Sequence, residues 1–287
     1  MTEEPYRWLE AMANRREYVR DQLKGGSPVF AVSLPDGILL LGVGGGQSKV
    51  FELFDRHALA GLGHPADIEK VRQAAIDAAH LEAFTRAAED VSLRRLIGFG
   101  LSPQLKTQFD QIFTAPFLVE LLLAELGAEP GQDLLFRLHF DGAFQVQSGG
   151  AVIAASQPEA ESAGQSWLNE ALRDKTSRPE VVDLLLQAWW CQVQNKWLAE
   201  SVPDAAQRQA GWREAVRGKT VEIGWLARHG PRPARYQPLT RIFHSLVLKG
   251  VFWDRKLEIV QRNGLVSSGK GGRLHAEDSM AVRWWIF

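Results

Sequence analysis

Two short runs of almost continuous apolar residues near the start of the chain constrain its fold most. They cover residues 28–34 and 38–43 and are separated by Pro35-Asp36-Gly37, a sequence typical of a tight hairpin turn. A strand that is exposed on one face alternates apolar and polar residues, whereas these runs are apolar at nearly every position. They therefore predict an antiparallel hairpin within a sheet that is covered on both faces.

Further helix and strand patterns surround this hairpin. Helices are predicted where apolar residues recur at helical spacing, and strands where short apolar or alternating runs lie between turn residues. The predicted helices cover residues 6–24, 66–85, 92–126 with a break at Pro103 or Pro116, 158–173, 179–198 and 239–249. The further predicted strands cover residues 49–53, 57–62, 133–140, 143–147, 150–154 and 220–227.

The order of these segments predicts the fold class. Strands with helices in pairs indicate two stacked sheets between two helical layers. We therefore expect an α+β fold, a four-layer αββα sandwich. It would occupy residues 1–250, with an insertion at 203–218. A C-terminal extension at 251–287 holds a Gly/Ser-rich linker and an aromatic terminus, Trp284–Phe287.

Composition argues against several functional classes. No segment approaches the roughly 18 uninterrupted apolar residues that span a membrane, and the N-terminal sequence lacks the apolar core of a secretory signal. The single cysteine, Cys191, fits a reducing cytoplasm. The first 205 residues carry 18 basic and 28 acidic side chains, and the remaining 82 carry 15 and 6. Since no nucleic-acid-reading motif accompanies this asymmetry, we interpret it as charge that pairs within the molecule or across a subunit contact. A cytoplasmic protein with no membrane or nucleic-acid partner is expected.

Sequence motifs give no support for metal or cofactor chemistry. The seven histidines show neither HExxH nor paired ligand spacing, and one cysteine makes a zinc site untenable. Residues 264–271 nearly match a phosphate-binding loop, but Gly271 replaces the hydroxyl residue that binds Mg²⁺. Residues 42–46 follow a strand but lack the third glycine of a dinucleotide-binding turn. We expect no metal and no cofactor.

Four segments resemble, in the same order, the α subunits of bacterial proteasomes, particularly those of the actinobacterial type. They are EAMANRREYVRDQLKGGSPVFAV, QSKVFELFDRHALAGLG, FDQIFTAPFLVELLLAELG and VEIGWLARHGPRPARYQPLTRIFHSL. In that family they correspond to the helix before the first strand, the third and fourth strands, the second helix with its exit, and the last strand with the closing helix. The resemblance spans residues 6–250, leaves 203–218 and 251–287 unmatched, and implies the proteasome fold of the Ntn-hydrolase superfamily.

The resemblance also implies a function in protein degradation. Proteasome α subunits form heptameric rings that cap the β-type rings of a threonine protease. They gate the axial pore and accept the C-termini of regulatory ATPases in pockets between neighbours. This chain is thereby expected to be a non-catalytic subunit without catalytic residues. Its expected partners are further copies of itself, β-type proteasome subunits and regulatory ATPase C-termini.

The same resemblance implies particular site residues. Lys49 would be the cation that pairs an incoming carboxylate in the activator-binding pocket. Gly26 would allow close backbone approach there, and His64 falls in the same pocket. The gate would consist of Met1, Thr2, Glu3, Glu4 and Pro5.

Two alternatives remain open. Self-cleavage between Gly26 and Ser27 would release an N-terminal serine whose own amine activates its hydroxyl, giving a peptidase or amidohydrolase assisted by Lys49. Against this, Ser27 joined to Gly26 has only an amide nitrogen, and the supporting carboxylate expected near Val43 is missing. The third possibility is a stand-alone binding scaffold whose segment Trp284–Phe287 docks a partner.

Overall fold

The structure is a computed structural model that describes residues 4–111, 113–199, 201–229 and 235–239. The chain divides into two compact units, Met1–Ser245 and Leu246–Phe287, and all the described residues belong to the first. The C-terminal extension, the Gly/Ser-rich linker and nearly all of the predicted helix at 239–249 lie outside the described residues.

The first sheet contains the predicted apolar hairpin. In sheet order its strands are β10 (Tyr236–Pro238), β9 (Thr220–Ala227), β2 (Gly37–Gly44), β1 (Val29–Leu34) and β8 (Ala151–Ala154). Neighbouring strands are antiparallel, and every residue of β2 is buried. The prediction of a hairpin covered on both faces is therefore confirmed.

The second sheet corrects one prediction. In sheet order its strands are β3 (Val50–Phe54), β4 (His57–Gly63), β5 (Val119–Glu125), β6 (Leu134–His139) and β7 (Phe144–Ser148). The predicted helix over 92–126 is wrong in its last part, because its apolar run forms β5. All seven residues of β5 are buried between β4 and β6. A short continuous apolar run does not distinguish a buried strand from a buried helix.

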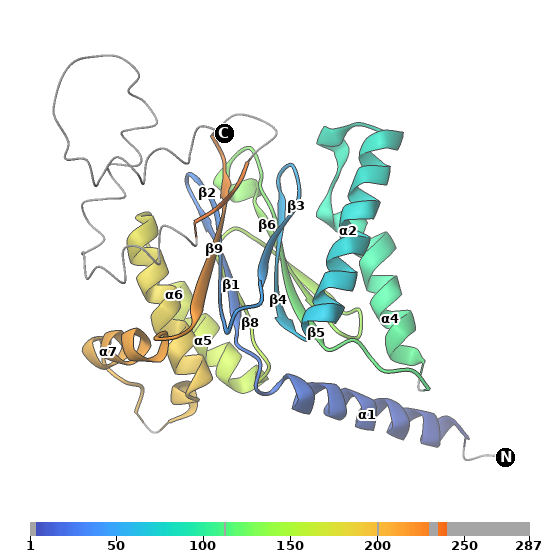
Figure 1. Ribbon diagram of the computed structural model, residues 1–287, viewed down its shortest axis with the longest axis horizontal. Coiled ribbons are helices and arrows are strands. Elements are labelled where there is room, and N and C mark those ends of the chain that lie inside the picture. Colours follow the sequence, from blue (N-terminus) through green and yellow to red (C-terminus); the bar gives the residue numbers. More distant parts are fainter. Residues whose placement is uncertain (1–3, 112, 200, 230–234, 240–287) are drawn as a thin grey trace. The chain divides into compact units, whose positions relative to one another are not determined.

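Helices cover the outer faces of both sheets, as Figure 1 shows for the first unit. The helices are α1 (Glu4–Leu23), α2 (Pro65–Thr85), α3 (Leu93–Arg95), the π-helical η2 (Leu96–Leu101), α4 (Ser102–Asp110), α5 (Pro158–Ala171), α6 (Arg178–Val193) and α7 (Ala205–Ala215). α2 and α4 lie on the second sheet, and α5 and α6 lie on the first. The fold is the predicted α+β, four-layer αββα arrangement. In the described part of the chain, no helix has the length and apolarity that a bilayer crossing needs.

The segment predicted as an insertion at 203–218 forms α7. The side chain of Asp204 accepts from the backbone N of Gln207, and the Gln207 side chain in turn accepts from the Asp204 backbone, which is a complete capping box. A Cβ on Gly211 would lie 2.3 Å from Trp190 of α6. The glycine therefore lets the two helices pack in close contact.

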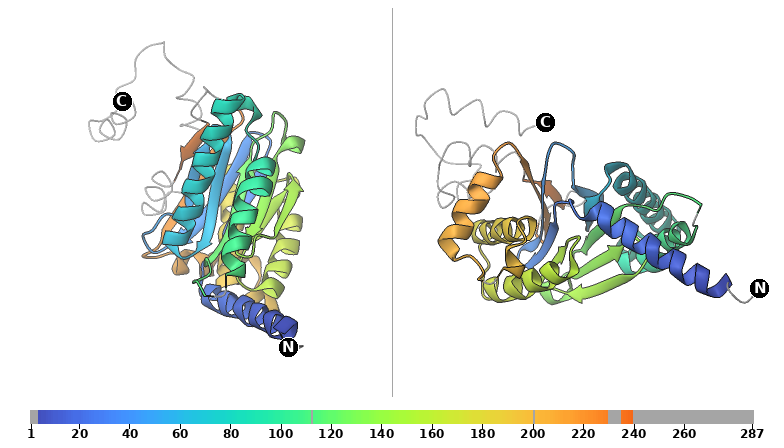
Figure 2. Two further views of the ribbon diagram at one scale, coloured as in Figure 1. Left: turned by 90° about the vertical axis from the view of Figure 1, so that its right-hand side faces the viewer. Right: turned by 90° about the horizontal axis from the view of Figure 1, so that it is seen from below.

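α1 lies across one end of the sandwich, seen from below in Figure 2. Its residues Val19 and Leu23 are 0% and 3% exposed and belong to the core beneath α2. The helix begins at Glu4, so the predicted gate residues Glu4 and Pro5 are helical, whereas Met1–Glu3 lie outside the described residues. The predicted start at residue 6 was two residues late.

A tight glycine contact sets the exit of α1. The backbone N of Gly26 donates to the carbonyl O of Leu23 at 2.7 Å. A Cβ on Gly26 would lie 2.8 Å from that oxygen and 2.8 Å from Cγ of Leu62 in β4. Any side chain at this position would therefore force α1 and β4 apart.

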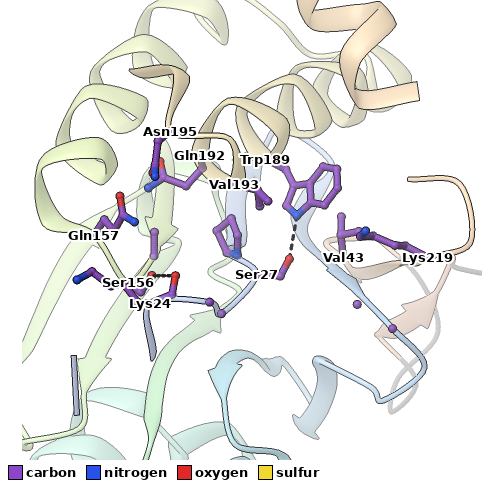
Figure 3. Close-up of a pocket in the computed structure, with 16 residues that line it drawn as sticks. Lys24, Ser27, Val43, Ser156, Gln157, Trp189, Gln192, Val193, Asn195 and Lys219 are labelled. Atoms are coloured by element: carbon purple, nitrogen blue, oxygen red, sulfur yellow. Dashed lines mark hydrogen bonds between the residues drawn. The ribbon is translucent and has the colours of Figure 1, made fainter. Parts of the chain in front are cut away.

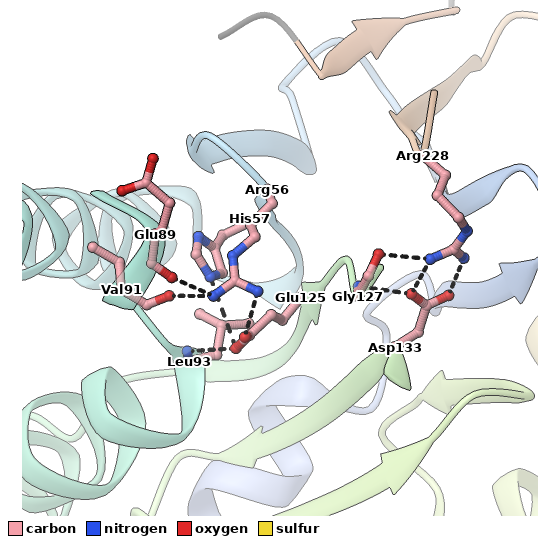
Figure 4. Close-up of polar contacts among 9 residues, drawn as sticks. All are labelled: Arg56, His57, Glu89, Val91, Leu93, Glu125, Gly127, Asp133 and Arg228. Carbon is pink, nitrogen blue, oxygen red and sulfur yellow. Dashed lines mark hydrogen bonds and ion pairs between the residues drawn. The ribbon is translucent and has the colours of Figure 1, made fainter. Parts of the chain in front are cut away.

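A buried ion pair joins the two sheets at the opposite end (Figure 4). Both carboxylate oxygens of Asp133 accept from the Arg228 guanidinium, at 2.9 and 2.7 Å. Asp133 also accepts from Ser33 Oγ at 2.6 Å and from the backbone N of Gly127 at 2.9 Å. Arg228 in turn donates to the carbonyl oxygens of Leu34, Pro35 and Gly127. The β1–β2 turn, the β5–β6 loop and the end of β9 are thereby held together.

A second polar cluster in Figure 4 lies in the helix-covered side of the second sheet. Glu125 pairs with Arg56 at 3.2 Å and accepts from the backbone N of Leu93 at 2.7 Å. Arg56 also donates to the carbonyl oxygen of Val91 at 2.8 Å. The β3–β4 turn is thus fastened to the start of α3.

Replacing Asp133 should destabilise the chain strongly. The Asp133→Ala change leaves Arg228 buried without its carboxylate, and we expect the free energy of unfolding to fall by about 3–5 kcal/mol. Chemical denaturation followed by tryptophan fluorescence measures this. The control is Asp110→Ala, which breaks the exposed pair with Lys106 and should cost about 1 kcal/mol or less. Equal losses in the two variants would contradict the structural role of Asp133.

Replacing Gly26 should loosen α1. In Gly26→Ala the added Cβ meets Leu23 and Leu62, so amide hydrogen exchange across α1 should become faster than in the parent chain. Gly25→Ala is the matched control, because a Cβ on Gly25 meets nothing within 4 Å. Unchanged exchange in Gly26→Ala, or equal acceleration in both variants, would show that this contact does not hold the helix.

Candidate functional site

The structure brings three of the predicted site residues together at the end that α1 crosses. Gly26 and Ser27 connect α1 to β1, and Lys49 directly precedes β3. Lys49 Nζ donates to the backbone carbonyl O of Ser27 at 3.3 Å. Residues that the sequence separates by 22 positions therefore form one polar site.

His64, the third residue predicted for the activator-binding pocket, is not joined to the other two by a hydrogen bond. It is exposed at the N-cap of α2, where its backbone N donates to the carbonyl O of Leu118 at 2.8 Å. Its side chain makes no capping hydrogen bond, and in the described ranges no hydrogen bond or ion pair joins it to Lys49. A pocket role for His64 stays a prediction.

Lys49 is a partly buried cation. In the described part of the molecule it has no carboxylate within ion-pair range, and the Ser27 carbonyl is the acceptor of its ammonium. An ammonium group has three donors. Burial lowers the pKa of Lys49, and the nearby charge of Glu222 acts in the opposite direction. The site therefore presents a positive charge whose hydration is incomplete.

Glu222 is a site residue that the sequence analysis missed. Its Oε2 accepts from the backbone N of Lys49 at 2.8 Å and from that of Val50 at 3.2 Å. Burial raises the pKa of Glu222, and these hydrogen bonds and the Lys49 charge oppose the shift. The sequence analysis looked for a carboxylate near Val43, whereas the structure supplies one from β9. The signal was available, because a lone acid in the apolar strand TVEIGWLA needs a buried partner.

Ser27 also borders a pocket between the α1–β1 connection and α6 (Figure 3). Ser27 Oγ accepts from Nε1 of the buried Trp189 at 2.8 Å. The pocket has a volume of about 290 Å³, and the charged residues that line it are Lys24 and Lys219. Ser156 Oγ donates to the carbonyl O of Lys24 at 3.2 Å. These two hydrogen bonds fasten the connection between α1 and β1 to the residues around the pocket.

The described contacts of Ser27 do not include a general base. The described partner of the Ser27 hydroxyl is an indole N–H, which cannot accept a proton, and Lys49 reaches the Ser27 carbonyl. Among the described residues, no group of three or more His, Cys, Asp or Glu side chains could hold a metal ion. An ammonium group such as that of Lys49 can form charge-assisted hydrogen bonds with a carboxylate.

Comparison with known proteins gives a consistent set of relatives. No family model matches the chain. The protein named proteasome subunit alpha in Paenarthrobacter aurescens is 32% identical over 192 residues, covering 61% of this chain and 79% of that protein. The protein of the same name in Pseudarthrobacter chlorophenolicus is 29% identical over 226 residues, covering 77% and 86%. In Streptomyces griseus the match is 29% identical over 181 residues and covers 62% of this chain but only 65%, just under two thirds, of that protein.

These matches agree with the architecture of the first unit. The predicted resemblance to bacterial proteasome α subunits is confirmed, and so is the fold that it implied. The chain therefore belongs to the proteasome subunit alpha family.

Proposed function

We propose that the chain is a non-catalytic ring subunit of a cytoplasmic bacterial proteasome. It forms a heptameric ring on β-type protease rings, gates substrate entry with its N-terminal segment, and docks the C-termini of regulatory ATPases. The similarity to proteins named proteasome subunit alpha supports assembly with other proteasome subunits. One observation carries the docking role: the Lys49 ammonium, anchored at the Ser27 carbonyl without a carboxylate partner in the described residues.

A peptide carboxylate suits this ammonium for an electrostatic reason. Partial burial removes part of the water that would stabilise the Lys49 charge, as the lowered pKa of Lys49 indicates. An incoming carboxylate replaces that lost hydration with a hydrogen bond between opposite charges, which contributes about 1.5–3 kcal/mol. Glu222 does not take this place: its Oε2 accepts from two backbone N–H groups, and the structure has no ion pair between its carboxylate and the Lys49 ammonium.

Retention of the N-terminal helix favours the non-catalytic role over the N-terminal serine hydrolase. Cleavage after Gly26 would remove the buried Val19 and Leu23 from the core. Burial of such side chains is worth about 1.5–3 kcal/mol each. While α1 stays attached, Ser27 has an amide nitrogen and no free amine to act as a base.

Assembly and processing can be tested on the same sample. Coexpressed with its β-type partner, the purified chain should give a ring by native mass spectrometry and an unshortened mass for this subunit. A species that lacks the first 26 residues and is labelled at Ser27 by an electrophilic proteasome inhibitor would establish the hydrolase instead. Only monomers at micromolar concentration would contradict the ring.

Lys49→Ala should remove carboxylate recognition. We expect the assembled ring to bind a fluorescein-labelled Gly-Gly-Tyr-Leu peptide with a free C-terminus about 10- to 100-fold more tightly than Lys49→Ala does, since a charge-assisted hydrogen bond is lost. Fluorescence anisotropy measures this, and the same peptide as a C-terminal amide should not distinguish the two proteins. Lys70→Ala, which removes an exposed lysine already paired with Asp67, should bind like the parent. Equal binding by Lys49→Ala would contradict the docking role.

The same binding should depend on pH in a defined direction. Burial lowers the pKa of Lys49, and only the protonated ammonium attracts a carboxylate. Affinity for the free-acid peptide should therefore be retained below the pKa of Lys49 and fall as the pH rises through it, earlier than for an ordinary lysine. Affinity for the amide peptide should stay constant across that range.

A further inference from the structure

We propose that Glu222, Gly42 and Gly44 form a cradle that positions the Lys49 ammonium for its carboxylate ligand. Glu222 fixes the backbone from which Lys49 projects, and the two glycines leave a channel for its side chain. The inference rests on the proposed carboxylate-docking role of Lys49 and assigns to that site three positioning residues.

The backbone of Lys49 is held from two directions. Its N–H donates to Glu222 Oε2 in the first sheet, and its carbonyl O accepts from the backbone N of Gly61 in the second sheet at 2.9 Å. Glu222 also accepts from the N–H of Val50, the first residue of β3. Since Glu222 is 8% exposed, it has little freedom to move. The Cα–Cβ direction of Lys49 is therefore set by both sheets together.

The side chain of Lys49 then runs along β2 past Gly42 and Gly44, which have no side chains. A Cβ on Gly42 would lie 3.2 Å from Lys49 Cβ, and a Cβ on Gly44 would lie 3.4 Å from Lys49 Cε. Gly42 is the register partner of Glu222, and alternate residues of a strand share a face, so both glycines and Glu222 lie on one side of the sheet. The contacts follow the lysine stem from its base to its tip.

The two glycines of the cradle lie inside a strand, where glycine lowers stability. Residues 38–41 of β2 are all large aliphatics, whereas Gly42 and Gly44 lie where the Lys49 side chain runs against the strand. A glycine in a strand interior weakens the strand and often marks the close approach of another group. Here that group is the Lys49 stem. Without the cradle the stem would be free to turn away from the Ser27 carbonyl, to which its Nζ now donates.

The charge of Glu222 has a second effect on the same lysine. Burial favours loss of the Lys49 proton, whereas the Glu222 carboxylate raises the pKa of Lys49 and so helps to retain the charge. Because no ion pair forms between the two side chains, the ammonium stays available to a ligand. Glu222 is therefore a positioning residue for Lys49.

The test compares cradle variants in assembled rings, using the ratio of affinities for the free-acid and amide forms of the Gly-Gly-Tyr-Leu peptide. Glu222→Ala and Gly42→Val should each lower this ratio about tenfold, as expected for a weakened charge-assisted hydrogen bond. Glu222→Gln keeps an oxygen for the two N–H groups but removes the charge. Its affinity ratio at neutral pH should stay nearer to that of the parent. As the pH rises, the ratio should begin to decline at a lower pH than in the parent, because the pKa of Lys49 is no longer raised by the Glu222 charge. Glu52→Gln, the same change at an exposed position on β3, is the control and should match the parent in both respects.

The outcomes separate this inference from the docking role. A ratio that falls in Lys49→Ala but stays at the parent value in Glu222→Ala and Gly42→Val would discard the cradle and leave the docking role intact. A ratio unchanged in Lys49→Ala would remove the basis of both. If Glu222→Ala fails to assemble, Gly42→Val and the pH profile of Glu222→Gln decide the question. In the double variant Lys49→Ala with Glu222→Ala, the ratio should fall no further than in Lys49→Ala alone.

Discussion

The buried pair of Asp133 and Arg228 is the interaction on which the two-sheet arrangement depends most. Both side chains are almost fully enclosed, and their polar contacts reach three connections that belong to different sheets. A buried charge without its partner is strongly destabilising, so the pair enforces one relative placement of these connections. The β1–β2 turn and the end of β9 in the first sheet are thereby joined to the β5–β6 loop of the second sheet.

At the opposite end of the sandwich, the buried acid Glu222 makes a different kind of contact. Glu222 also bridges the sheets, but it accepts from backbone N–H groups. Among the described residues, the neighbouring Lys49 ammonium donates to the Ser27 carbonyl and has no carboxylate partner. The two ends therefore differ: the acid at one end pairs directly with a buried guanidinium, and the acid at the other end holds backbone N–H groups beside a cation.

The sequence predicted the layers well because binary patterns carry that information. The hairpin around Asp36, the strand at 220–227 and the paired helices followed from periodicity and turn residues. The prediction failed at residues 119–125, because a uniformly apolar run shows neither the helical nor the strand period. It also missed Glu222 and Trp189, because their contacts with Lys49 and Ser27 join residues more than 160 positions apart in the sequence. Such contacts arise from sheet register, which local patterns do not specify. Lys49 and Gly26 were predicted from the family resemblance, and the structure brings both to Ser27.

The anchoring of α1 has a consequence for cleavage before Ser27. The peptide bond before Ser27 lies between α1, whose Val19 and Leu23 side chains belong to the core, and the first residues of the central strand β1. Liberating an amine at that point and keeping the helix covalently attached exclude each other. Release of the Ser27 amine therefore requires loss of the helix and of the two side chains, Val19 and Leu23, that it contributes to the core.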